Sequence, residues 1–523
     1  MYKWKIKNMH LDQTNLVENI YRSRGVSNYL ELFNLNEKNL NDPYLFKDMQ
    51  KSVDRIMSSI KNNEKILIYG DYDVDGITST FILYNTLKDL GANIHYDIPN
   101  RFIDGYGLTY SKTYEIINDQ FNLVITVDNG IKSVYEAKAL KENGIDLIIT
   151  DHHEQENELP DAYSILHTEL SNYPFKHLAG VGVAFKLSQA LIGEHALNYI
   201  DIVALGTIAD MMPLIDENRA IVNLGLKKMI SSENIGLARL ISFLGLEHPS
   251  VSDIQFKIAP RLNACGRMKS AKIAVELLLS KNNDIALQYL KEIEEINNKR
   301  KKLTKLLFNE ALKQLNQNEP SIIISSPIMH EGVLGIIASR LANEYSKVSV
   351  VLKEEEFTFK GSIRSYESVD IIYVLSELKD LLVRYGGHKN AAGLEFKKEN
   401  FDNFKKRFND LIPSAKREEL VTAEGIIDIY KLDINQIVEL DKFDLKDSLF
   451  IFDSIYPESK YLIKGEHTKL IINSNTEAIF FNNKKLHSKI NSSSRVALLG
   501  HLDINTFRGK SKKQILIEDF EIN

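Results

Sequence analysis

Three short apolar segments, residues 66–70, 123–127 and 145–150, occur in the first third of the chain. Each is rich in Ile, Leu and Val, and the stretches between them have helical character. Apolar runs of this length that alternate with helices are typical of strands buried on both faces of a parallel sheet. The pattern therefore predicts an α/β domain.

Carboxylates and histidines follow these strands. They are Asp71, Asp73 and Asp75 after the first, Asp128 after the second, Asp151, His152 and His153 after the third, and Asp210 after a fourth apolar segment, residues 199–209. Ligands of open parallel sheets bind at the carboxyl ends of the strands, and crowded carboxylates need a cation to neutralise them. An acidic surface turn would explain residues 71–75 alone, since Asp and Gly are common in turns. The repetition of strand followed by acid favours a metal site.

Later segments predict further domains. A long helix begins near Asp284, and its basic residues 299–302 are expected to be mostly solvated. A second α/β unit is predicted from a strand, a helix and a strand at residues 321–325, 332–345 and 348–352. Beyond residue 418, short alternating runs without long helices predict a small β-barrel.

The length of 523 residues suggests two or three domains. The chain has 44% hydrophobic and 26% charged residues, with no secretory signal and no apolar run of membrane-spanning length, so we expect a soluble cytoplasmic protein and no membrane partner. The single cysteine, Cys265, excludes an internal disulfide and a cysteine-based zinc site, which leaves oxygen and nitrogen as metal ligands. The net charge of −6 does not decide the substrate, because basic residues can gather in a local groove.

The acidic motifs resemble, in the same order, the four motifs of the DHH phosphoesterase superfamily. Residues 386–393, a Gly-Gly-His segment ending in Ala-Ala-Gly, resemble the signature of the associated DHHA1 domain. Within the superfamily, the chain is most similar to the RecJ single-strand-specific exonucleases. The segments that carry this similarity are Arg101 with residues 105–108, and residues 173–186, 259–267 and 330–340.

The resemblance implies a fold of two α/β domains joined by a helical connector and followed by a small OB-like β-barrel. The first is the parallel-sheet DHH domain and the second a smaller DHHA1 domain. The expected boundaries are a leader at 1–63 packed on the first domain, the DHH domain at 64–215, the connector with its long helix at 216–318, the DHHA1 domain at 319–415 and the OB-like domain at 416–523.

The activity implied by the resemblance is metal-dependent hydrolysis of single-stranded DNA to mononucleotides, in the 5′ to 3′ direction, during DNA repair and recombination. The other implied partners are a helicase and a single-strand-binding protein. One alternative is a phosphoesterase of the same superfamily that acts on oligoribonucleotides, adenosine bisphosphate or cyclic dinucleotides. Another is an inactive nucleic-acid-binding subunit of a repair or replication assembly.

Phosphodiester hydrolysis of this kind uses two divalent ions held by shared carboxylates. The candidate metal ligands are Asp73, Asp75, Asp128, His152 and Asp210. The resemblance makes Asp128 the bridging, catalytic carboxylate, and Asp71 ranks below the others. Imidazole among the ligands favours Mn²⁺ over Mg²⁺. We expect His153 to contact the scissile phosphate or to protonate the leaving oxygen.

Phosphate and base contacts are expected from arginines, which offer a planar fork, and from glycines, which admit a close backbone. The candidate substrate-binding residues are Arg101, Tyr106, Arg261, Arg267, Ser362, Arg364, Gly387 and His388. Arg261 and Arg267 are expected to flank a short turn, Tyr106 to stack on a base, and Arg300 to join the site by resemblance. Two segments depart from the family pattern: Tyr69 replaces a histidine, and residues 441–447 lack the usual Pro-Phe-Gly segment.

Overall fold

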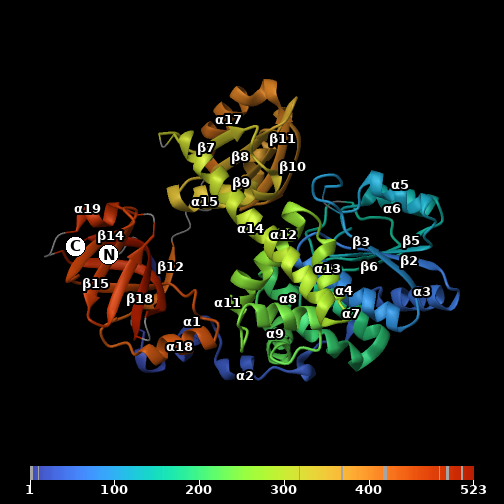
Figure 1. Ribbon diagram of the computed structural model, residues 1–523, viewed down its shortest axis with the longest axis horizontal. Coiled ribbons are helices and arrows are strands. Elements are labelled where there is room, and N and C mark those ends of the chain that lie inside the picture. The colour runs from blue at the N-terminus through green and yellow to red at the C-terminus, as the bar shows by residue number, and fades with distance from the viewer. Residues whose placement is uncertain are drawn as a thin grey trace.

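The computed structural model describes residues 4–9, 11–105, 107–156, 158–316, 318–366, 369–415, 421–481, 483–490, 494–507 and 510–522. The strands form three sheets, which belong to two α/β domains and a C-terminal β domain. In Figure 1 the first α/β domain lies at the right, the second at the top and the C-terminal domain at the left. The predicted fold class is confirmed.

The first α/β domain contains a five-stranded parallel sheet in the order β3-β2-β4-β5-β6. Its strands are β2 (Lys65–Tyr69), β3 (Asn93–Asp97), β4 (Leu123–Val127), β5 (Asp146–Thr150) and β6 (Ser164–Leu166). The chain moves outward from β2 to β3 and then returns past β2 to β4. This reversal is a topological switch point, where a crevice opens at the carboxyl ends of the strands.

Helices cover both faces of this sheet. They are α4 (Val74–Asp89), α7 (Gly180–Ile192) and α8 (Ile200–Ala209) on one face, and α5 (Tyr110–Asn118) and α6 (Val134–Glu142) on the other. Ile66, Ile68 and Ile125 point into the first layer, whereas Leu67 and Val124 point into the second, as the period of two along a strand requires. The buried helix predicted at residues 199–209 is confirmed as α8.

The connector packs into the same core as the first α/β domain, so residue 215 does not separate two cores. Its elements are α9 (Asp216–Met229), α10 (Ile235–Phe243), α11 (Val251–Asp253), the π-helix η5 (Ile254–Ile258), α12 (Ala259–Met268), α13 (Lys272–Leu278) and α14 (Asn283–Lys313). Leu290 and Ile293 on the first half of α14 pack in that core, and Leu307 and Phe308 on its second half pack against the second α/β domain. One rigid helix therefore fixes the spacing of the two α/β domains.

The second α/β domain has a five-stranded mixed sheet in the order β10-β11-β9-β8-β7. Its elements are β7 (Ile322–Ser326), α15 (Glu331–Tyr345), β8 (Ser349–Glu354), β9 (Thr358–Arg364), α16 (Ile371–Ser376), β10 (Leu382–His388), β11 (Ala391–Lys397) and α17 (Phe401–Ala415). The predicted strand, helix and strand are confirmed as β7, α15 and β8. The edge strand β10 is largely exposed, because only β11 pairs with it.

The C-terminal domain is built on an eight-stranded sheet in the order β1-β12-β13-β17-β18-β16-β15-β14. Its elements are β1 (Lys5–Asn8), α1 (Leu16–Ser23), β12 (Thr422–Ile426), α18 (Ile434–Lys442), β13 (Phe450–Ile455), β14 (Ser459–Ile463), β15 (His467–Asn473), β16 (Thr476–Phe480), α19 (Lys485–Lys489), β17 (Val496–Phe507) and β18 (Lys510–Ile522). The predicted short strands are therefore present. Strand β17 ends at Phe507 and β18 begins at Lys510, and residues 508–509 are outside the described part of the chain.

The leader divides between two domains. Strand β1 pairs with β12 in parallel, and Leu16 and Ile20 of α1 belong to the core of the C-terminal domain. Helices α2 (Tyr29–Phe33) and α3 (Met49–Lys61) follow. Phe46 and Met49 pack on the first α/β domain, as predicted for the whole leader. That prediction is wrong for β1 and α1, since their apolar faces are covered by strands that lie about 400 residues later in the sequence.

Short 3-10 turns complete the described structure at Gln13–Asn15, Glu37–Asn39, Pro43–Leu45, Gly193–Tyr199, Lys379–Leu381 and Lys398–Asn400.

Residues 441–447 join the C-terminal domain to the rest of the protein. The Phe443 ring makes edge contacts with Tyr29 and Phe33, at centroid distances of 5.2 and 4.9 Å. Asp444 forms an ion pair with Arg219 of the connector. The segment that departs from the family pattern is thus an interdomain contact.

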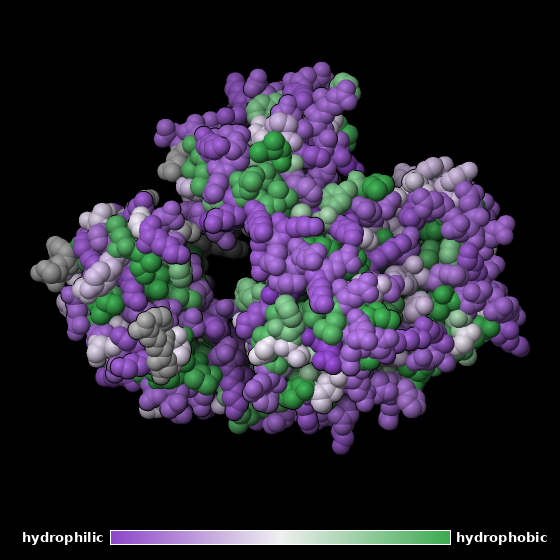
Figure 2. All heavy atoms as spheres, viewed as in Figure 1, coloured by the Kyte–Doolittle hydropathy of each residue, from purple (hydrophilic) through white to green (hydrophobic). Residues whose placement is uncertain are grey.

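Figure 2 shows an opening between the three domains, bordered on the connector side mainly by hydrophilic residues. Within the described residues, no helix has the length and apolarity needed to cross a membrane.

A buried ionic network ties the leader to α7 and α9. Lys186 and Glu217 are both fully buried and lie 2.5 Å apart. Glu217 also accepts hydrogen bonds from the Tyr173 hydroxyl and from the side chain and backbone N–H of Asn41. Lys186 donates to the Asn41 carbonyl oxygen. Each charge is neutralised and hydrogen-bonded, which offsets the cost of its burial.

We expect Lys186→Met to lower the thermal unfolding midpoint, because it leaves Glu217 as an unpaired buried charge. Breaking such a pair costs about 3–5 kcal/mol. The matched control is Lys141→Met, which breaks the exposed Lys141–Asp161 pair and should cost about 1 kcal/mol or less. Circular dichroism melting compares the two variants. Equal midpoints for both would contradict the importance of the buried pair.

Candidate active site

The predicted acidic residues converge at the switch point of the first sheet. Asp71 and Asp73 follow β2, Asp128 follows β4, and His152 and His153 follow β5. Asp210 enters from the C-terminal end of α8. Three overlapping groups of these side chains have ligand atoms within 4.8 Å of one another; they are Asp71, Asp73 and Asp128; Asp75, His152 and Asp210; and Asp128, His152 and His153.

Asp128 is common to two of the three groups. His152 Nε2 lies 3.2 Å from Asp128 Oδ1, 3.6 Å from Asp75 Oδ2 and 3.7 Å from Asp210 Oδ2. On its other side, Asp128 meets Asp71 and Asp73. Its central place fits the predicted bridge between two ions. Asp71, which ranked below the other candidates, lies in the same cluster.

Asp73 and Asp75 are oriented by helix ends rather than by alternation along a strand. The Asp73 carboxylate caps α4 by accepting the N–H groups of Asp75 and Gly76 at 3.0 and 3.2 Å. Asp75 lies in the first turn of α4, and each of its oxygens accepts one N–H from the start of α7, Gly180 or Val181, at 2.7 Å. Helix N-termini favour negative charge. The two helices thus stabilise the acidic cluster.

Burial and mutual repulsion keep several of these carboxylates from ionising easily. Burial, reinforced by the charge of Asp73, raises the pKa of Asp75 to about 7. Burial and the charge of Asp75 raise the pKa of Asp210 to about 8 and that of Asp128 well above its ordinary value. Burial and Asp73 act likewise on the pKa of Asp71. Buried oxygens of Asp71 and Asp128 have no hydrogen-bond donor among the described residues. These unpaired oxygens are suited to bind a cation.

The neighbouring histidines His152 and His153 have opposite pKa shifts, and the contact with Asp151 distinguishes them. Its carboxylate accepts the backbone N–H of Ile131 and His152 and contacts His153 Nδ1 at 2.8 Å, so its oxygens are engaged. Burial lowers the pKa of His153, but Asp151 outweighs this and raises it to about 9. Burial and the neighbouring His153 charge lower the pKa of His152 to about 3. His152 is thus neutral at physiological pH, the form that a metal ligand requires, and His153 carries a proton beside the acidic cluster.

Helices α7 and α12 pack closely against the acidic cluster. A Cβ on Gly180 would lie 2.5 Å from Asp128 Oδ1, and a Cβ on Gly266 would lie 2.3 Å from the Tyr72 carbonyl oxygen. Asn263 Oδ1 accepts the Val74 N–H at 3.1 Å. Residues 261–267 belong to helix α12, so the prediction of a turn there is wrong. Helix α12 presses against the acidic loop instead, a role that its sequence did not reveal.

A cleft of about 750 Å³ runs from the acidic cluster to the second α/β domain. Its walls carry the cations Arg101, Arg267, Lys360, Arg364 and Arg384. Burial and the neighbouring Arg101 charge lower the pKa of Arg267 to about 10. The Arg101 guanidinium also lies 4.9 Å from the centre of the Tyr72 ring. The cleft is therefore acidic at one end and basic along its walls.

Most of the predicted substrate contacts line this cleft. Ser362 and Arg364 are on β9, where Arg364 donates to Ser362 Oγ, and Gly387 and His388 are on the edge strand β10. Lys360 and Arg384 were missed. Lys360 is two residues from Ser362, and Arg384 is two residues from Gly386, so each shares a strand face with a residue of a predicted segment. This spacing could have identified both cations from the sequence.

Other predicted residues lie elsewhere. Arg261 pairs with Glu294 at 2.8 Å and does not line the cleft. Arg300 is partly buried on α14 and donates to Asn297 Oδ1, whereas Lys299, Lys301 and Lys302 are exposed, as expected. Tyr106 is outside the described residues. Tyr69 is buried, and its hydroxyl donates to the Gly107 carbonyl at 3.3 Å, so it supports the loop before α5.

The fold and the acidic cluster define a phosphoesterase of the DHH class, and comparison with known families agrees. Residues 65–207 match the DHH family, N-terminal domain, residues 319–414 match the DHHA1 domain and residues 443–519 match the RecJ OB domain.

Individual relatives identify the family within the DHH class to which the chain belongs. The single-stranded-DNA-specific exonuclease RecJ of Haemophilus influenzae is 32% identical to this chain, over 97% of this chain and 96% of that protein. RecJ of Bacillus subtilis is 36% identical over 92% of this chain, which spans 64% of that longer relative. A crystal structure of RecJ from Thermus thermophilus in complex with Mn²⁺ superimposes with a TM-score of 0.81 at 27% identity, covering 99% of this chain and 79% of that one. The chain belongs to the RecJ family.

We expect Gly180→Ala to weaken Mn²⁺ binding strongly, because the added methyl group collides with Asp128. The matched control is Gly182→Ala, two residues further along α7, where the Cβ would lie 3.2 Å from Leu178 side-chain atoms. Isothermal titration calorimetry with Mn²⁺ measures the binding, and circular dichroism reports the fold. Unchanged affinity in Gly180→Ala would contradict the close approach of α7 to the ion ligands.

The metal-free protein should lose stability as the pH rises from about 4 to about 8. The folded-state pKa values of Asp75 and Asp210 are raised, so their protons are held in the folded state and lost with a free-energy cost as the pH passes those values. Thermal unfolding midpoints in a chelator measure this. Asp210→Asn should flatten the profile, and Mn²⁺ should raise the midpoint most at the alkaline end. A midpoint independent of pH and Mn²⁺ would be the contrary result.

Proposed function

We propose that the chain is a metal-dependent exonuclease that hydrolyses the phosphodiester bonds of single-stranded DNA to mononucleotides, in DNA repair and recombination. The main observation behind the proposal is that an acidic cluster lies at one end of a cleft lined by arginines. The cluster suits divalent ions, and the arginine forks suit the phosphates of a nucleic acid. The names of the relatives supply the substrate.

The donor set suits a hard divalent cation that accepts imidazole. Structures of relatives hold Mn²⁺ or Mg²⁺, and His152 among the carboxylates favours Mn²⁺. Asp71, Asp73 and Asp128 would hold one ion, and Asp75, His152, Asp210 and the shared Asp128 would hold the other. When bound, two such ions neutralise phosphate charge and lower the pKa of water.

The protein's own groups position the substrate and move protons. Arg101, Arg267 and Arg364 would hold phosphate oxygens on the basic side of the cleft. His153 engages Asp151 through Nδ1, which leaves a proton on Nε2 available to the leaving oxygen. The cleft of about 750 Å³ falls within the range of about 300–1,000 Å³ typical of small-ligand pockets. It would therefore hold a few nucleotides of one strand rather than a duplex.

Several features of the proposal rest on the family alone. These are the 5′ to 3′ direction, the use of the C-terminal domain to bind the strand, and the partnership with a helicase and a single-strand-binding protein. The expected cytoplasmic location stays a prediction.

Purified protein with Mn²⁺ should degrade end-labelled single-stranded DNA faster than duplex DNA, a short oligoribonucleotide or a cyclic dinucleotide. Asp128→Ala should reduce hydrolysis at least a thousandfold, since it removes the shared ligand, while circular dichroism shows a retained fold. Cleavage of the small substrates without degradation of single-stranded DNA would support the alternative phosphoesterase. Absence of all hydrolysis would support a binding subunit, and substantial activity in Asp128→Ala would remove this residue as the bridge.

A further inference from the structure

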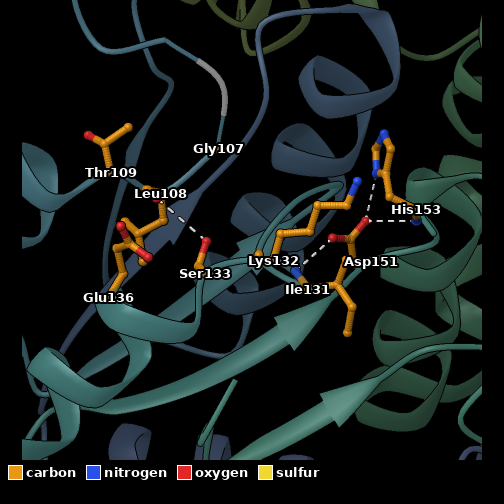
Figure 3. Close-up of a pocket in the computed structure, with 10 residues that line it drawn as sticks. Gly107, Leu108, Thr109, Ile131, Lys132, Ser133, Glu136, Asp151 and His153 are labelled. Carbon is orange, nitrogen blue, oxygen red and sulfur yellow. Dashed lines mark hydrogen bonds and ion pairs between the residues drawn. The ribbon is translucent and has the colours of Figure 1, made fainter. Parts of the chain in front are cut away.

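Packing alone does not fix the His153 ring, because cavities border it on two sides. The ring lines the large cleft and also a smaller pocket of about 260 Å³ (Figure 3). The described residues 152–156, which carry both histidines of the site, belong to no helix or strand. The shape of this loop therefore depends on a small number of hydrogen bonds.

Asp151 holds the loop through its donors. Asp151 Oδ1 accepts the backbone N–H groups of His152 and His153 at 2.7 and 3.1 Å, and it contacts His153 Nδ1 at 2.8 Å. Figure 3 shows the two contacts with His153, and the other nitrogen of that ring points away from Asp151. A carboxylate cannot hold the carbonyl groups of the loop, which need a donor from elsewhere.

His167 supplies such a donor from the neighbouring strand. The hydrogen bonds between β5 and β6 end where the Asp151 N–H donates to the Leu166 carbonyl oxygen at 3.2 Å. His167 is the next residue along the chain, and its side chain is buried. His167 Nε2 lies 2.9 Å from the His153 carbonyl oxygen. The ring thus continues the contact between the two chain segments beyond the point where strand pairing stops.

The two neighbours of the His167 ring determine its tautomer. The Glu169 backbone N–H lies 3.2 Å from Nδ1 and can only donate, so Nδ1 accepts. The carbonyl group at Nε2 can only accept, so Nε2 carries the hydrogen. A ring rotated by half a turn would lose both bonds. The buried ring is therefore locked in the orientation that donates to His153.

We propose that His167 is a positioning residue, which holds His153 where it protonates the leaving oxygen. The inference rests on the proposed nuclease function. In the hydrolysis, the water oxygen bonds to phosphorus, the bond from phosphorus to the leaving oxygen breaks, and that oxygen takes a proton from His153 Nε2. His153 regains a proton from solvent. His167 exchanges no proton; it fixes the backbone that bears the His153 ring, and a misplacement of about 1 Å can cost roughly a hundredfold in rate.

The test combines two substitutions with two single-stranded DNA substrates. His167→Asn keeps an acceptor for the Glu169 N–H, but its side chain is too short to donate to the His153 carbonyl group. His167→Gln is long enough to donate its amide N–H there. One substrate has an ordinary scissile phosphodiester, and the other has sulfur in place of the leaving oxygen. A thiolate leaves without a proton far more readily than an alkoxide does, because thiols are much stronger acids than alcohols.

With Mn²⁺, His167→Asn should lower kcat on the oxygen-linked strand about 10- to 100-fold, as loss of a supporting hydrogen bond to a catalytic histidine does elsewhere. Its KM should change less than about twofold, since ground-state binding is untouched. On the sulfur-linked strand the loss of kcat should be less than about threefold, because no proton is needed. His167→Gln should stay close to the wild type on both strands.

The matched control is Thr168→Val, which removes the hydrogen bond from the neighbouring buried hydroxyl to the Lys176 carbonyl oxygen. It should keep the wild-type ratio of the two kcat values. Circular dichroism and Mn²⁺ titration report the fold and the ion ligands of each variant.

Three results would overturn the positioning role. They are wild-type activity of His167→Asn on the oxygen-linked strand, equal losses on both strands, and a His167→Gln variant as impaired as His167→Asn. Unfolding of both His167 variants would likewise assign the residue to the core alone. A wild-type protein that cleaves neither strand instead defeats the nuclease function.

Discussion

The repulsion among buried carboxylates at the switch point is the constraint around which the first domain is organised. Asp71, Asp75 and Asp128 are nearly inaccessible to solvent and close together, an arrangement that costs free energy unless charge is neutralised. The domain offsets part of that cost with two helix N-termini. Backbone N–H groups at the starts of α4 and α7 hold Asp73 and Asp75 in place. The negative charge that the two helix N-termini leave uncompensated favours the binding of cations.

The same constraint explains why residues distant in sequence press against the acidic loop. Gly180 allows α7 to contact Asp128, and Asn263 of α12 holds the first turn of α4. Helix α14 then extends from this core into the second α/β domain, which carries the arginine-lined strands. The acidic cluster and the arginine-lined strands are therefore held at a fixed separation by one continuous helix, not by a flexible linker.

Prediction from the sequence succeeded where a local pattern has one physical cause. The strands before Asp71, Asp128 and Asp151 were evident because buried parallel strands are uniformly apolar. The predictions failed where long-range packing decides. Arg261 was grouped with Arg267 by motif, yet Glu294, some 30 residues later, holds it outside the cleft. Asp75 was expected simply as an acid that follows the first strand, but it lies in the first turn of α4 and backbone N–H groups of α7 orient it. Nothing near β1 in the sequence shows that its partner is β12.

The pairing of β1 with β12 has a consequence for how the protein is made. Lys7 and Arg24 both contact Glu424, and the first of these pairs spans 417 positions of the chain. At about 5–20 residues per second, the ribosome needs roughly tens of seconds to reach β12 after it has made α1. Throughout that interval Leu16, Val17 and Ile20 lack the strands that cover them in the folded state. The apolar face of α1 therefore gains its native cover only after the strands of the C-terminal domain have been made.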